Sequence, residues 1–189
     1  MLRVYRVTEL ASILTRYWSV PDETLKDAQQ RGTLVHSLCA AYARSRTFHE
    51  TSDKDIRGGQ GYFLSFKRWF DDYVAEVVSV ETSYTNIVGI IGHPDLVAVI
   101  RGDQAPSIID LKTAAAHDKI WRLQMAGYKH IVRNHAISNG ATPPERIFSL
   151  RLDPNGGPAK LREYTDTYLD DLAVLFSLVN IQRFIDSAE

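Results

Sequence analysis

Extended, β-branched segments cluster in the middle of this chain, and helical patterns lie on both sides of them. Residues 77–82 and 107–112 are rich in valine and isoleucine, which favours strands. Residues 88–91 and 95–100 are further apolar segments, and Gly92-His93-Pro94 separates them with a bend. A chain with several such strands must cover the faces of a sheet with helices.

The flanking regions supply those helices, because their apolar residues recur at helical spacing. Three helices are expected before the strands, over residues 8–17, 24–46 and 62–73, with Thr8 capping the first. After the strand over 107–112 we expect a helix over 118–135, strands over 147–152 and 160–164, and a last helix over 166–185 capped by Thr165. The order is helices, three strands, a helix, two strands and a helix. It predicts an α/β protein with a mixed central β-sheet flanked by helices.

The 189 residues show no internal repeat, no low-complexity tract and no long linker, so we expect one domain over residues 1–189. Its parts are a helical N-terminal region over about 1–74, a core over about 75–164 and a C-terminal helix over about 165–187. Hydrophobic residues make up 44% of the chain, which is ordinary for a globular protein that buries its own core.

Cysteine content and hydropathy exclude several classes of protein. Cys39 is the only cysteine, which excludes an internal disulfide, a four-thiolate zinc site and a protein-held iron–sulfur cluster. This usage indicates a reducing compartment, most simply the cytoplasm. No apolar run approaches the roughly 20 residues of a membrane helix, and the first residues lack a signal core. We therefore expect no membrane partner.

Net charge alone argues against a nucleic-acid partner, because 22 basic residues face 23 acidic ones. The distribution is uneven, however: residues 1–70 hold 11 basic and 7 acidic side chains, and residues 71–189 hold 11 and 16. The predicted helix that follows the strand over 107–112 is locally basic, with Lys119, Arg122, Lys129 and Arg133. These side chains could line a track for phosphates. A solvated helix face is the alternative interpretation.

Asp110-Leu111-Lys112 is the strongest local signal for chemistry. Residues two apart on a strand project to the same face, so the Asp110 carboxylate and the Lys112 ammonium are expected together. Charged groups at the end of an otherwise apolar strand cost desolvation energy unless they pair or bind a ligand. A salt bridge at the strand end is the structural alternative.

Asp95 follows the glycine–proline bend fifteen residues upstream of Asp110. A turn around Gly102 would join two neighbouring strands and bring the two carboxylates side by side. Close carboxylates repel each other unless a cation lies between them. Mg²⁺ is commonly held by one or two carboxylates together with water and substrate phosphate, so a magnesium site is expected here. For Asp95 alone, a turn residue after proline is the alternative.

Four elements together resemble the PD-(D/E)XK nuclease superfamily. Pro94-Asp95 and Asp110-Leu111-Lys112 are similar to its signature, with aspartate as the second acid. Arg31-Gly32-Thr33-Leu34-Val35-His36 resembles the R-G-T-x-x-H element of the RecB-like and phage-type exonuclease branch. Gln124 and Tyr128 resemble its Q-x-x-x-Y element, and their spacing places them on one helical face. The resemblance covers about residues 31–132 and implies a restriction-endonuclease-like αβββαβ core with an N-terminal helical elaboration.

The resemblance also implies roles for these residues. Mg²⁺ or Mn²⁺ would be held by His36, Asp95, Asp110 and the Leu111 carbonyl. Lys112 would orient or deprotonate the attacking water, and Gln124 and Tyr128 would position water or phosphate. From the distribution of charge, we expect Arg31, Lys119, Arg122 and Lys129 to contact DNA.

The expected activity is metal-dependent hydrolysis of phosphodiester bonds, most simply by an exonuclease that acts on DNA ends in recombination, repair or phage DNA processing. Such an enzyme would work in the cytoplasm of a bacterial or phage-infected cell, with a recombination or single-strand-binding protein as a partner. One alternative is a catalytically silent nucleic-acid-binding or assembly module on the same fold. Another is a generic α/β protein in which Asp110 and Lys112 form a structural ion pair.

Overall fold

A five-stranded mixed sheet forms the centre of the computed structural model, which describes residues 4–14, 22–45, 58–86, 89–114 and 118–187. The strand order is β2-β5-β6-β7-β8. The strands are β2 (Val74–Val80), β5 (Leu96–Ile100), β6 (Ser107–Lys112), β7 (Arg146–Arg151) and β8 (Lys160–Glu163). β6 and β7 pair in parallel, and the other neighbours pair antiparallel. The prediction of a mixed central sheet is confirmed.

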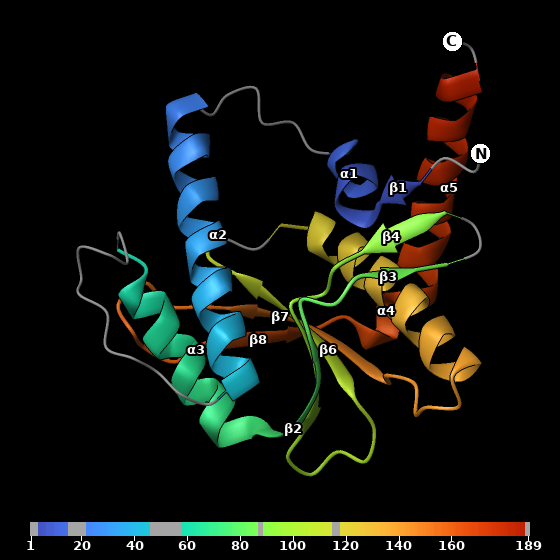
Figure 1. The fold of residues 1–189 in the computed structure, drawn as a ribbon. Helices are drawn as coiled ribbons and strands as arrows, with labels where there is room; N and C mark the ends of the chain where they lie inside the picture. The colour runs from blue at the N-terminus through green and yellow to red at the C-terminus, as the bar shows by residue number, and fades with distance from the viewer. Residues whose placement is uncertain (1–3, 15–21, 46–57, 87–88, 115–117, 188–189) are drawn as a thin grey trace.

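Helices cover both faces of this sheet (Figure 1). On one face lie α2 (Asp22–Ser45) and α3 (Gln60–Tyr73), and on the other lie α4 (Ile120–Ser138) and α5 (Tyr168–Ser187). Each pair of helices encloses its own apolar core against the sheet. The described helices include none that combines the length and apolar character of a membrane span.

A second, three-stranded sheet packs beside α4 and was not predicted from the sequence. It consists of β1 (Tyr5–Arg6), β4 (Ile90–Gly92) and β3 (Tyr84–Thr85), with β1 parallel and β3 antiparallel to β4. The short helix α1 (Val7–Ser12) follows β1 directly. Strands of two residues are too short to show a hydrophobic period, so only the segment that contains β4 was recognisable.

The two predicted helix caps are wrong. Arg6, in an extended conformation, precedes α1, because the chain passes from β1 straight into the helix. Residues 15–17 of the helix expected over 8–17 lie outside the described residues. The Thr165 hydroxyl accepts a hydrogen bond from the Ile147 N–H at 3.2 Å, and a short 3-10 turn, η1 (Thr165–Thr167), comes before α5.

Two glycines allow the small sheet and α1 to approach α4 closely. A Cβ atom on Gly92 would lie 2.7 Å from a Tyr128 ring carbon and 2.8 Å from Ile131 Cδ1. A Cβ atom on Gly127 would lie 2.7 Å from Val7 Cγ1. Contacts this short require displacement of buried side chains. The glycines therefore fix how closely β4 and α1 sit against the helix that carries Gln124 and Tyr128.

Replacing Gly92 with alanine should destabilise the fold. Because Tyr128 and Ile131 are buried, we expect Gly92→Ala to lower the free energy of unfolding by about 1–3 kcal/mol. Gly32 lies inside α2, where an added Cβ would meet nothing closer than 3.6 Å. Gly32→Ala should therefore raise stability by about 0.5–1 kcal/mol. Urea unfolding of the two variants measures both effects, and equal effects would contradict the packing argument.

Candidate active site

Alternation along β6 sets the direction of its charged residues. Ile109 packs in the core beneath α2 and α3, whereas Ile108 packs in the core beneath α4 and α5. Asp110 and Lys112 therefore project with Ile108 toward α4. Asp110 is only 2% exposed, and its carboxylate forms an ion pair with the Lys112 ammonium. The structure brings these two residues together at the end of the strand, as their spacing predicts.

Asp95 lies beside this pair because β5 and β6 are adjacent, with Leu96 opposite Ile109. The Asp95 side chain is buried and both of its oxygens are engaged. Oδ2 accepts a hydrogen bond from the Leu111 N–H at 2.6 Å, and Oδ1 lies 2.9 Å from His36 Nδ1. The carboxylate thus connects β5, β6 and α2 at one point.

Gln124 and Tyr128 approach from one face of α4. The Lys112 ammonium donates to Gln124 Oε1 at 2.7 Å, and the Gln124 amide donates to the Tyr128 hydroxyl at 2.9 Å. The same amide nitrogen lies 3.4 Å from Asp110 Oδ1. Gln124 therefore links Lys112 and Asp110 to α4, and its expected part in positioning water or phosphate stays a prediction.

Glu81 is a further acidic residue at this site, and sequence reasoning missed it. It follows β2 with φ 51°, the only described non-glycine residue with a positive φ. Its carboxylate, His36 and Asp95 each offer an atom within 4.8 Å of the others. Such a backbone conformation costs of order 1–3 kcal/mol and is concentrated at functional sites. Nothing in the sequence distinguishes Glu81 from an ordinary residue at a strand end.

Burial and mutual repulsion raise the pKa values of two of the carboxyl groups. Burial, with the charge of Asp95, raises the pKa of Asp110 to about 6 despite the neighbouring Lys112. Burial and Asp95 likewise raise the pKa of Glu81 to about 7. In both cases burial is the larger cause, and the negative charge of Asp95 adds to it.

His36 and Asp95 behave as a pair. Burial opposes ionisation of Asp95, but the His36 charge and hydrogen bonds from His36 and the Leu111 N–H hold its pKa below the ordinary value. Burial also opposes protonation of His36, yet the attraction of Asp95 raises the His36 pKa to about 9. Without a metal ion, the imidazolium of His36 supplies part of the positive charge that the acidic cluster requires.

The donor set fits a divalent cation. Glu81, Asp95 and His36 each offer a ligand atom within 4.8 Å of the others, and Asp110 lies on β6, the strand next to the one that follows Asp95. Carboxylate oxygens are preferred ligands of Mg²⁺, and Mn²⁺ accepts imidazole as well. A cation bound here would offset the excess negative charge and displace the proton of His36. The Leu111 carbonyl stays a predicted ligand.

The residues predicted to contact DNA differ in their exposure and in their partners. Arg31 is partly exposed, with its guanidinium 5.9 Å from the centre of the Tyr62 ring, and Lys119 is exposed just before α4. Arg122 is paired with Asp171 of α5 at 2.8 Å.

Lys129 is buried, and its partners lie outside the candidate site. Its ammonium donates to the Glu145 carbonyl and lies 4.7 Å from the centre of the Tyr168 ring. The predicted phosphate contact of Lys129 is therefore not supported. Lys129 instead contributes to the packing of α4. The basic residues that follow β6 in the sequence therefore do not form a continuous track for phosphates.

Two cavities meet at the acidic residues. A cavity of about 670 Å³ lies along α2 and includes Arg44 and Glu81 in its lining. A cavity of about 370 Å³ lies between β1, β4 and α4, with Arg6, Lys112 and Tyr128 among its lining residues. Both are lined by His36 and Asp95. The site is therefore reachable from two sides.

Comparison with known families agrees with this arrangement. A sequence profile of the PD-(D/E)XK nuclease superfamily matches residues 56–183. The match covers more than half of the chain and includes Asp95, Asp110 and Lys112, so the chain belongs to this superfamily. The comparison with curated proteins finds no match.

Several solved structures are similar to this chain. One is the "Putative exonuclease" from Eubacterium rectale, at 14% identity and a TM-score of 0.55, covering 97% of this chain and 80% of that one. Another is an alkaline exonuclease from Laribacter hongkongensis, at 13% identity and a TM-score of 0.46, covering 99% of this chain and 93% of that one. The similarity to the Eubacterium rectale structure shows the fold alone.

The His36 pair should make the stability of the metal-free protein depend on pH. Because the folded-state pKa of His36 is about 9, above its ordinary 6.5, its stabilisation is complete below 6.5 and is lost as the pH rises through 9. In EDTA we expect the thermal midpoint of the wild type to fall over this range more steeply than that of His36→Gln. Parallel falls in both proteins would contradict the assignment.

Proposed function

We propose that the protein is a Mg²⁺- or Mn²⁺-dependent deoxyribonuclease that hydrolyses phosphodiester bonds, most simply as an exonuclease acting on DNA ends. The observation that carries the proposal is the convergence of Asp95, Asp110 and Lys112 on one point that opens into two cavities. A structural ion pair alone would need neither the second buried carboxylate nor His36 and Glu81 beside it.

The acidic residues would hold the cation, with Asp95 and Asp110 as its central ligands and His36, Glu81 and the Leu111 carbonyl around them. When bound, such a cation lowers the pKa of water and neutralises charge on the phosphate. The oxygens of the buried Asp95 carboxylate are already oriented, because the Leu111 N–H and His36 hold them. Little reorganisation of these ligands is then needed during the reaction.

Lys112 would act on the water and on the phosphate. Its ammonium is held by Asp110 and Gln124, and it lies 5.4 Å from the centre of the Trp121 ring. This position, in the lining of the smaller cavity, would let it orient the attacking water and stabilise the charge that builds on the phosphate oxygens. Gln124 and Tyr128 then serve as positioning residues for Lys112.

The choice of an exonuclease rests on two supports. The R-G-T-x-x-H and Q-x-x-x-Y elements resemble the branch of the superfamily that acts on DNA ends, and His36, Gln124 and Tyr128 from these elements line the same cavity. The structural neighbours from Eubacterium rectale and Laribacter hongkongensis also carry the name exonuclease.

Digestion assays test the proposed activity. With Mg²⁺ or Mn²⁺ we expect the wild type to degrade linear DNA and to leave covalently closed circles intact. Lys112→Ala should lower the rate about 100-fold or more, because it removes the group that positions water. Lys160→Ala, on the exposed strand β8, is the matched control and should retain the wild-type rate.

Each outcome of these assays separates the alternatives. Degradation of closed circles would indicate an endonuclease. Undiminished digestion by Lys112→Ala would refute the role given to that residue. No digestion by the wild type with any divalent metal would refute the proposed activity in favour of a silent binding or assembly module.

Metal binding can be measured without catalysis. A ligand that binds only the folded state stabilises it, by about 2.7 kcal/mol at a hundredfold excess over its Kd. We expect Mn²⁺ to raise the thermal midpoint of the wild type by several degrees and to do so much less in Glu81→Gln and Asp95→Asn. Glu76→Gln, on the exposed part of β2, should respond like the wild type. Equal shifts in all four proteins would place the cation elsewhere.

A further inference from the structure

We propose that the DNA strand being cut crosses the acidic residues from one cavity to the other, and that Arg6 and Arg44 bind its phosphates on opposite sides of the scissile bond. This inference rests on the proposed function and extends it to the path of the substrate. Neither residue lies within the part of the chain that the superfamily profile matches, residues 56–183.

The two cavities define the path. The larger one runs along α2, and the smaller one lies between α4 and the small sheet. They share His36 and Asp95, so a strand seated in both would place a phosphate beside the proposed metal ligands. The phosphates before and after it would then lie in different cavities.

Arg6 lies on β1 and lines the smaller cavity, which His36 of α2 also lines. β1 pairs with β4 so that Tyr5 is opposite Ile90 and Arg6 is opposite Ile91. Tyr5 and Ile90 are buried in the core, whereas Arg6 and Ile91 are on the alternate face and line the smaller cavity. The Arg6 side chain is 67% exposed, and its ion pair with Glu9 is long, at 3.8 Å. Such an exposed ion pair contributes little to stability, so the Arg6 guanidinium can leave Glu9 and bind a phosphate at a small cost in free energy.

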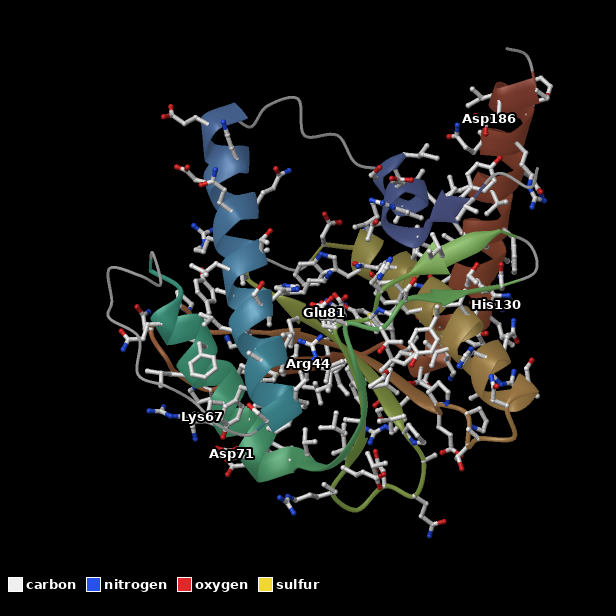
Figure 2. The ribbon with its side chains drawn as sticks, in the orientation of Figure 1. Arg44, Lys67, Asp71, Glu81, His130 and Asp186 are labelled. Carbon is white, nitrogen blue, oxygen red and sulfur yellow. The ribbon has the colours of Figure 1, made fainter. Side chains whose placement is uncertain are left out.

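Arg44 lines the larger cavity beside Glu81. It lies in the last turn of α2, is exposed, and donates from Nη2 to the Val80 carbonyl at 3.2 Å. Figure 2 shows it near Glu81, between α2 and the sheets, and both residues line the cavity. The hydrogen bond to Val80 uses one of five N–H donors, which leaves the others for a phosphate.

The charge of the site explains why both cavities need a guanidinium. Glu81, Asp95 and Asp110 repel the phosphates that flank the scissile bond, and a cation at the centre offsets this repulsion for the central phosphate only. Arginine presents a planar array of donors that matches phosphate oxygens, so one residue per cavity can compensate locally. Arg122 and Lys129 do not supply this compensation, because they are held by Asp171 and the Glu145 carbonyl.

Binding of a fluorescent single-stranded DNA oligonucleotide tests the path. The measurement is anisotropy over a series of salt concentrations, in an Asp110→Asn background that prevents cleavage. We expect Arg6→Ala and Arg44→Ala each to weaken binding about 5- to 10-fold and to reduce the slope of log K against log salt by about 0.7, the value for one phosphate contact on a single strand. Arg6→Lys and Arg44→Lys should keep the slope.

Arg162→Ala is the matched control, because Arg162 lies on the exposed edge strand β8 and lines neither cavity. Thermal midpoints of all variants show whether the fold is retained. Affinities and salt slopes of Arg6→Ala and Arg44→Ala equal to those of Arg162→Ala would overturn the inference, even if wild-type protein digests DNA. Failure of the wild type to digest any DNA would refute the proposed function separately, since the binding measurement does not depend on cleavage.

Discussion

The buried carboxylate of Asp95 holds the site together. Its two oxygens bind the Leu111 N–H on β6 and the His36 ring on α2, while its backbone carbonyl accepts the Glu81 N–H at the end of β2. One residue thereby fixes the relative positions of three strands and a helix. Breaking one of these contacts would leave a charged group buried without a partner, which is far more costly than losing an exposed hydrogen bond.

Local patterns predicted what depends on local geometry. Alternation along a strand was enough to place Asp110 beside Lys112, and the turn between two strands was enough to place Asp95 next to them. The positions of the main helices and strands followed from their hydrophobic periods for the same reason. His36 was suggested by family resemblance, because its approach to Asp95 spans 59 residues of sequence and no local pattern encodes it.

What the sequence did not reveal depends on tertiary contacts. Glu81 enters the site through an unusual backbone conformation, and β1 exists only because it pairs with a strand far along the chain. Lys129 belongs to a basic run in the sequence, but helical geometry turns it toward Glu145 and Tyr168. Net charge was misleading for a related reason: part of the acidic count is gathered at one buried cluster, where a cation would offset it.

The pairing of β1 with β4 has a consequence for the order in which the molecule is assembled. Tyr5 must find a partner 85 residues away, and its hydroxyl also bonds Asp186 Oδ2 across 181 residues at 2.9 Å. Contacts between such distant segments form late in folding, because long loops must close first. β1 would stay unpaired until β4 is available, and the Tyr5 hydroxyl would gain its partner only when α5 is in place. The wall that carries Arg6 would therefore form later than the pairing of β5 with β6, whose partners lie close in sequence.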